Sequence, residues 1–206
     1  MIEQGTPEWF AQRCGRITAS RIADVMAKTK TGWGASRKNY QAQLVAERLS
    51  GAVADSFSNA AMQWGVETEP EARRMYEADQ FVTVELAEFC QHPTIDDAGA
   101  SPDGYVGDDG LIEIKCPNTA THLDTMLSGK VPDKYIKQMQ WQMACTGRQW
   151  CDFVSYDPRV GTELALFIRR FDRDSELIAE IEQAVVDFDS EIESQIEKLK
   201  ALKETS

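Results

Sequence analysis

Residues Ser101–Pro117 read SPDGYVGDDGLIEIKCP. The segment LIEIK predicts a β-strand with two charged residues among aliphatic ones. Side chains alternate across a strand, so Glu113 and Lys115 share one face. The isoleucines Ile112 and Ile114 take the opposite, buried face. The strand therefore presents a carboxylate and an ammonium group side by side.

A tight turn should join this strand to the one before it. The residues Asp108–Gly110 fit a three-residue hairpin loop, in which a type I turn is followed by a left-handed glycine. With that loop, Asp103 falls across from Lys115, on the face of Glu113. A loop of two or four residues would put Asp103 on the other face, because a slip of one residue inverts a strand.

Two carboxylates on one sheet face repel each other unless a cation lies between them. A few oxygen ligands suit Mg²⁺, with Mn²⁺ as the expected substitute. A lysine beside them can lower the pKa of an attacking water and stabilise developing negative charge. Asp103, Glu113 and Lys115 are thus equipped for metal-assisted hydrolysis of a phosphodiester. The alternative is a surface hairpin with an ordinary Glu–Lys pair.

Several short motifs, in the same order along the chain, resemble the phage lambda-type exonucleases. These form the YqaJ-like viral recombinase family of the restriction-endonuclease-like PD-(D/E)xK nucleases. The central motif is Asp103 followed by Glu113-x-Lys115. The others are GRITAS at 15–20, WG at 64–65 followed by Glu69, SPDG at 101–104, Tyr135 followed by QMQ at 138–140, and YDPR at 156–159.

The resemblance implies an α/β fold with a restriction-endonuclease-like core, in which helices flank a central mixed β-sheet. It implies a single nuclease domain over residues 1–206, with its core at about 5–170 and an amphipathic C-terminal helix at about 174–203. Periodicity and turn signals predict the individual elements. Helices are expected after Thr6, near Ser20, and over 39–49, 59–79, 119–128 and 134–145, with a possible break at Gly65. Strands are expected over 81–86, 98–106, 111–115, 150–155 and 164–169, and a basic loop over 28–38.

The resemblance also assigns the catalytic set. Asp103 and Glu113 would bind Mg²⁺ together with the main-chain carbonyl of Ile114. Lys115 would position or activate the attacking water, and Glu69 would lie beside the metal. A pocket for the 5′-phosphate of the digested strand would be formed by Arg13, Ser20, Ser101 and Gln138.

Two further residues are candidates for DNA contacts. Met62 falls where the family places an apolar wedge between the strands. Trp33 lies in the basic loop, from which it could stack on a base or insert at a junction.

The implied activity is 5′→3′ digestion of the 5′-phosphorylated strand of linear double-stranded DNA, leaving a 3′ overhang for recombination by strand annealing. The family forms homotrimeric rings around DNA and works with a single-strand annealing recombinase. A phage or prophage origin in a bacterial cytoplasm is expected. Two alternatives remain open: an endonuclease of the same fold, and a non-catalytic protein that binds DNA ends.

Composition sets limits on these readings. The chain has 206 residues, 42% hydrophobic and 27% charged, which is typical of one globular domain. No run approaches about 18 apolar residues, and no secretory signal is visible at the start, so we expect no membrane span. Five cysteines without a Cys-x-x-Cys pair favour reduced thiols in the cytoplasm. The net charge of −12 argues against a polyanionic partner. Residues 11–50, however, carry eight basic and only two acidic side chains, so this part of the chain can still bind a polyanion.

Overall fold

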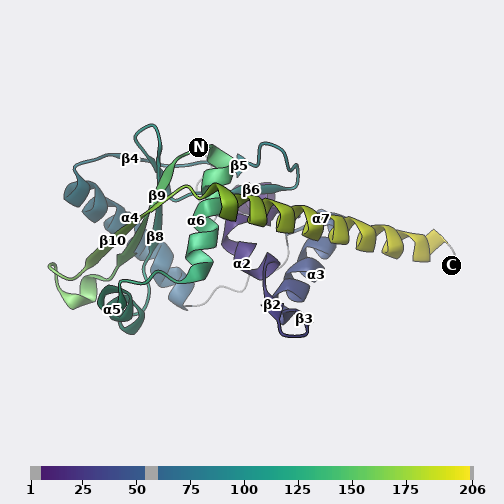
Figure 1. Cartoon of the computed structure of the whole chain (residues 1–206), viewed down its shortest axis with the longest axis horizontal. Coiled ribbons are helices and arrows are strands. Elements are labelled where there is room, and N and C mark those ends of the chain that lie inside the picture. Colours follow the sequence, from purple (N-terminus) through teal and green to yellow (C-terminus); the bar gives the residue numbers. More distant parts are fainter. Residues whose placement is uncertain (1–5, 54–59, 205–206) are drawn as a thin grey trace.

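A computed structural model describes residues 6–53 and 60–204. Its centre is a five-stranded sheet with the strand order β10-β9-β8-β7-β4 (Figure 1). The strands are β4 (Val84–Glu85), β7 (Gly104–Val106), β8 (Gly110–Lys115), β9 (Trp150–Tyr156) and β10 (Leu166–Asp172). β8 and β9 are parallel, and the other neighbours are antiparallel. The predicted mixed sheet is therefore confirmed.

The helices agree closely with the expected pattern. They are α1 (Pro7–Arg13), α2 (Ile22–Val25), α3 (Ala35–Ser50), α4 (Ala60–Gln80), α5 (Thr119–Ser128), α6 (Asp133–Thr146) and α7 (Ser175–Glu204). Thr6 caps α1 by accepting a hydrogen bond from the Trp9 amide, as its sequence predicts. α4 runs unbroken through Gly65 and Pro70, so the possible break does not occur. Asn59, the expected first residue of that helix, lies outside the described residues.

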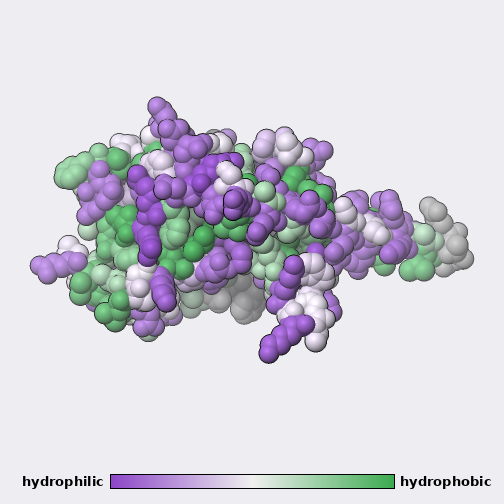
Figure 2. Space-filling model, viewed as in Figure 1, coloured by the Kyte–Doolittle hydropathy of each residue, from purple (hydrophilic) through white to green (hydrophobic). Residues whose placement is uncertain are grey.

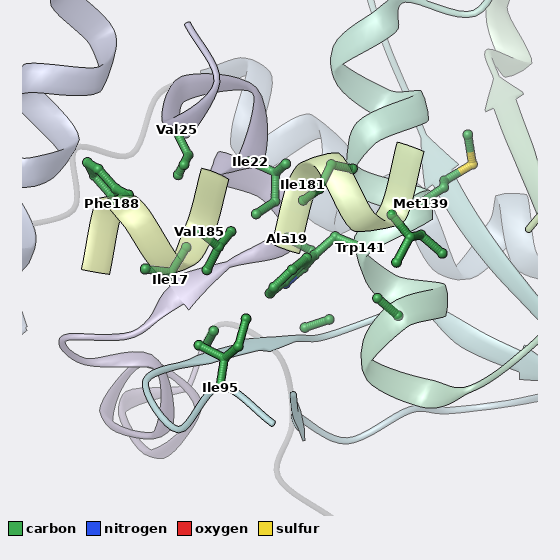
Figure 3. Close-up of a cluster of buried hydrophobic side chains, with 14 of the residues drawn as sticks. Ile17, Ala19, Ile22, Val25, Ile95, Met139, Trp141, Ile181, Val185 and Phe188 are labelled. Atoms are coloured by element: carbon green, nitrogen blue, oxygen red, sulfur yellow. The ribbon is translucent and has the colours of Figure 1, made fainter. Parts of the chain in front are cut away.

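The sheet packs apolar side chains on both faces. Ile112 and Ile114 pack with Tyr76 of α4 on one face. Leu111 points to the other face and joins a larger core with Trp141 of α6. Figure 3 shows this larger core, in which side chains of α2, α6 and α7 meet. The strand that carries the charged pair is therefore fixed from both sides.

α7 is the predicted amphipathic helix and supplies much of the larger core. Its stripe Ile181, Val185, Phe188, Ile192 and Ile196 is buried, as expected. Leu199, the next apolar residue at this helical spacing, is 39% exposed, so the buried stripe ends at Ile196. Figures 1 and 2 show that the C-terminal end of α7 projects beyond the rest of the molecule and is mostly hydrophilic.

The acidic α7 lies against the basic N-terminal quarter. Arg37 pairs with Glu191 at 2.6 Å, and Arg48 pairs with Asp189 at 2.7 Å and Glu193 at 2.6 Å. Arg37 is almost fully buried. Part of the basic charge noted in the sequence is thus neutralised within the chain, and these two arginines are structural.

The strand expected over 98–106 is two strands in different sheets. Its first part, β6 (Ala98–Ala100), lies between β1 (Ile17–Thr18) and β5 (Cys90–Gln91) in a three-stranded sheet. Its last part is β7 of the central sheet. The chain changes sheet at Pro102, which has no N–H to donate to a strand ladder.

Three other boundaries differ from the prediction. The basic loop over 28–38 contains a hairpin of β2 (Lys28–Thr29) and β3 (Gly32–Trp33), and α3 already begins at Ala35. The strand expected over 81–86 shrinks to Val84–Glu85, since Phe81 has a φ of 55°. β10 extends to Asp172 because it pairs along the full length of β9.

Candidate active site

The hairpin that carries Asp103 has its three-residue loop one position earlier than predicted. Val106 pairs with Gly110, so the loop is 107–109, and Gly107 has the left-handed φ of 55°. Gly110 is required in the strand, because a Cβ there would lie 2.1 Å from the Trp150 ring. Extending this register places Asp103 across from Glu113. The prediction that Asp103 lies across from Lys115 is therefore wrong. The predicted face is right, because the pairing moves by two residues and side chains two apart on a strand share one face.

Asp103 is buried at the end of the β7–β8 ladder. Its Oδ2 accepts a hydrogen bond of 2.7 Å from the amide of Ile114, where a partner strand would otherwise continue. The N–H and C=O of one strand residue point to the same side, so the Ile114 carbonyl faces the side of Asp103. Burial, and then the nearby carboxylates of Glu113 and Glu69, raise the pKa of Asp103 well above its usual range.

Glu113 is fully buried, and both of its carboxylate oxygens accept hydrogen bonds from α6. Gln138 Nε2 donates to Oε1 at 2.7 Å, and Gln142 Nε2 donates to Oε2 at 2.6 Å. Lys115 Nζ forms an ion pair with Oε1. The carboxylate is thus held in one orientation by three donors.

Lys115 lies on the same face as Glu113, as predicted, with its Nζ 5.3 Å from the centre of the Tyr135 ring. Burial disfavours its charged form, but the carboxylates of Glu113 and Asp103 outweigh this and raise the pKa of Lys115. Lys115 is therefore an ammonium ion at neutral pH and partly neutralises the two carboxylates.

Glu69 reaches the site from α4. It pairs with Arg73 one helical turn further on, at 2.8 Å. Burial raises the pKa of Glu69, while the charges of Arg73 and Lys115 lower it and that of Glu113 raises it. A third carboxylate thus lies close enough to Lys115 and Glu113 to interact with their charges, and its place beside a metal ion stays a prediction.

The donor set fits a hard divalent cation. Two buried carboxylates that repel each other, with a carbonyl on the same side, suit Mg²⁺, which usually keeps several water ligands. Within residues 6–53 and 60–204, no three His, Cys, Asp or Glu side chains are grouped as a complete metal site. The groups that could hold an ion here are Asp103, Glu113 and the Ile114 carbonyl, and the identity of the ion as Mg²⁺ or Mn²⁺ stays a prediction.

A cavity of about 430 Å³ lies between α1 and α3. Three arginines line it, namely Arg13, Arg16 and Arg21, together with Ser20 and Tyr40. Met62 of α4 also lines it and is 54% exposed. The predicted phosphate ligands Arg13 and Ser20 are thus brought to one cavity, with Met62 at the same place.

Arg13 connects this cavity to the carboxylates. Its Nη1 donates to Ser101 Oγ at 2.9 Å, and its guanidinium lies 4.1 Å from the Trp9 ring centre. Burial lowers the pKa of Arg13 to about 10, which leaves it charged at neutral pH. Since Ser101 precedes Asp103 by two residues, one short segment carries both the partner of Arg13 and one of the two buried carboxylates.

Two predicted DNA-contacting residues lie elsewhere. Gln138 contacts Glu113 and is not among the described side chains that line the cavity. Trp33 stands on the β2–β3 hairpin, where the side chains of Arg37 and Lys28 lie 3.8 and 5.1 Å from its ring centre. It is 40% exposed, and its role on DNA stays a prediction.

Sequence reasoning missed Gln142, and it did not assign Arg16 and Arg21 to the cavity. The spacing of Gln138 and Gln142 was a usable signal, because residues four apart share one helix face. The arginines gave no comparable signal, since basic side chains near a helix usually face solvent.

Comparison with known proteins finds relatives that cover most of the chain. The YqaJ-like viral recombinase domain matches residues 8–149. An alkaline exonuclease from Laribacter hongkongensis (LHK-Exo) is 55% identical, with a TM-score of 0.91, over 97% of this chain and 99% of its own. Its complex with dAMP gives the same values. A phage-related exonuclease from Haemophilus somnus 129PT, 17% identical with a TM-score of 0.70 over 89% of this chain and 96% of its own, shares the fold. No curated protein matches the chain.

Proposed function

Because the chain belongs to the YqaJ-like viral recombinase family, we propose that it is a Mg²⁺-dependent 5′→3′ exonuclease acting on linear double-stranded DNA. It digests the 5′-phosphorylated strand and leaves a 3′ single-stranded overhang for recombination by strand annealing. The observation that carries the proposal is the contact of Arg13 with Ser101, which couples a cationic cavity to the Asp103–Glu113 pair.

The carboxylate site supplies the chemistry. Asp103, Glu113 and the Ile114 carbonyl would hold Mg²⁺, which supplies Lewis-acid stabilisation of negative charge on the scissile phosphate. Lys115 carries a fixed positive charge beside the carboxylates, so it can donate a hydrogen bond to the attacking water or to a phosphate oxygen. Glu69 lies near Lys115 and can accept a hydrogen bond from the same water.

The cavity supplies the preference for the end of the strand. Arginine recognises a terminal phosphate well, because its guanidinium presents several N–H donors in one plane. Arg13, with Ser20 and the neighbouring arginines, binds the 5′-phosphate and sets the distance from the end to the scissile bond. Met62, on the same cavity wall, separates the terminal base pair.

Assembly extends the proposal. The chain forms a homotrimeric ring around DNA and works with a single-strand annealing recombinase in the cytoplasm of a bacterial host. In a ring, DNA contacts only the inner wall, so the net charge of −12 is tolerated on the outside. No helix within residues 6–53 and 60–204 is both long and apolar enough to cross a bilayer.

Metal-site variants and two DNA substrates test the activity. Asp103→Ala and Glu113→Ala should abolish nucleotide release from linear duplex in Mg²⁺, while both variants still bind DNA ends in Ca²⁺. A covalently closed circle should stay intact with the unaltered protein. Cutting of the circle would indicate an endonuclease of the same fold. Binding of ends without cleavage in Mg²⁺ or Mn²⁺ would indicate a non-catalytic assembly protein.

A further inference from the structure

Gln142 is a fully buried amide in the middle of α6, four residues after Gln138. Its Nε2 donates to Glu113 Oε2 at 2.6 Å. Its own Oε1 is buried and has no hydrogen-bond partner among the described residues. Such an unsatisfied acceptor is uncommon in native proteins and calls for a physical reason.

The charge of Glu113 provides that reason. A carboxylate can only accept hydrogen bonds, so the Gln142 amide must turn its nitrogen towards Glu113 and leave its oxygen unpaired. Turning the amide over would set its oxygen against the carboxylate, so the nitrogen stays on Glu113 even though the oxygen has no partner. In Gln140, two residues away on the same helix, both ends are paired: its Nε2 donates to the Asp172 carbonyl, and its Oε1 accepts from the Asp174 amide.

The donors on Glu113 also determine which oxygen stays available. Oε1 accepts from both Gln138 and Lys115, which together occupy its two lone pairs. Oε2 accepts from Gln142 alone, so one of its lone pairs remains open. Gln142 thus fixes the direction of the only carboxylate lone pair on Glu113 that the described residues leave free.

We propose that Gln142 is a positioning residue that aims the open lone pair of Glu113 Oε2 at the catalytic divalent cation. The inference rests on the proposed function, because it needs Glu113 to be a metal ligand. Groups that orient metal ligands in this way typically contribute 10- to 100-fold to metal affinity or activity.

The test compares Gln142→Met with the matched control Gln140→Met. Binding of Mn²⁺ to the full chain is measured from the loss of the free-ion electron paramagnetic resonance signal, and stability from urea unfolding in EDTA. Gln142→Met should weaken Mn²⁺ binding about 10- to 100-fold. The urea midpoint checks that this variant stays folded, so that weaker Mn²⁺ binding is not a consequence of unfolding. Gln140→Met loses two satisfied bonds and should bind Mn²⁺ like the unaltered protein.

Nuclease kinetics add a second measurement. In Gln142→Met the Mn²⁺ concentration for half-maximal rate should rise, with kcat at saturating Mn²⁺ changed far less. If the Mn²⁺ dissociation constant of Gln142→Met lies within about twofold of that of the unaltered protein, the proposed role of Gln142 is wrong. The proposed function itself would not be affected by that result. The variant Glu113→Gln separates the two levels: if it binds Mn²⁺ as tightly as the unaltered protein, the proposed metal site fails, and the role of Gln142 fails with it.

Discussion

Arg13 and Ser101 are 88 residues apart in the sequence and joined by a hydrogen bond of 2.9 Å. The bond ties α1, which lines the cavity of the arginines, to the segment that leads into Asp103.

Arg13→Ala should remove the preference for 5′-phosphorylated ends. The side chain lines the cavity and also reaches Ser101, so its loss should remove a charge-assisted bond to the phosphate. The ratio of digestion rates on 5′-phosphate and 5′-hydroxyl ends should fall about 10-fold or more, since such a bond contributes about 1.5–3 kcal/mol. Lys30→Ala, which removes an exposed cation outside the cavity, is the control and should keep the ratio. A ratio unchanged in Arg13→Ala would remove the cavity from the mechanism.

Asp103→Asn should stabilise the protein in EDTA while it abolishes cleavage. The substitution relieves repulsion between buried carboxylates and keeps an oxygen to accept from the Ile114 amide. We expect a gain of about 0.5–2 kcal/mol in the free energy of unfolding, as is common where function conflicts with stability. Urea unfolding measures it, with the exposed turn variant Asp108→Asn as control. A clear loss of stability would contradict the view that this pair is strained without a cation.

The ion pair between Arg37 and Glu191 should matter more than most surface pairs. Arg37 is buried, with its guanidinium 3.8 Å from the Trp33 ring centre and 4.6 Å from that of Phe188. Glu191→Gln leaves this charge without its partner and should cost about 1–3 kcal/mol of unfolding free energy. Glu197→Gln, further along the exposed side of α7, should change it by less than about 0.5 kcal/mol. Equal effects of the two variants would count against a structural role for this acidic helix.

Asp157 should give the folded state a pH-dependent contribution. Burial disfavours its charge, but hydrogen bonds from Arg159 and Thr119 outweigh this and lower the pKa of Asp157 to about 2. The unfolded chain, with an ordinary aspartate pKa near 4, binds its proton first as the pH falls. The stabilisation is therefore complete above about pH 4 and is lost towards pH 2. The difference in unfolding free energy between the unaltered protein and Asp157→Asn should shrink over that interval, whereas a difference constant with pH would refute this assignment.

Local patterns predicted much of the fold. The strand around Glu113, the helix at 119–128 and the buried stripe of α7 follow from alternation and helical periodicity, which the tertiary structure left intact. The division of the strand expected over 98–106 at Pro102 was not predicted. A strand pattern on both sides of a proline does not show that the two parts join different sheets. The hairpin register was predicted one residue off because Gly110 is kept in the strand by its close contact with the Trp150 ring. Trp150 is far away in the sequence, so no local pattern around Gly110 indicates this contact.

The candidate site was only partly predictable for the same reason. Asp103, Glu113 and Lys115 meet through a local hairpin, so their shared face could be deduced from spacing. Gln142 and the arginines of the cavity reach their places through packing of helices far apart in the sequence. The pairing of basic residues in α3 with acids of α7 shows that charge counts alone do not identify a DNA-binding surface.

The proposed activity is digestion of one strand of a duplex from its 5′-phosphorylated end. A linear duplex with a 5′-phosphate on one strand only, separate labels on the two strands, and Mg²⁺ tests it. The phosphorylated strand should be lost selectively, released as nucleotides from its 5′ end, while the other strand survives as a 3′ overhang. Equal loss of both strands, or loss that starts from 3′ ends, would contradict it.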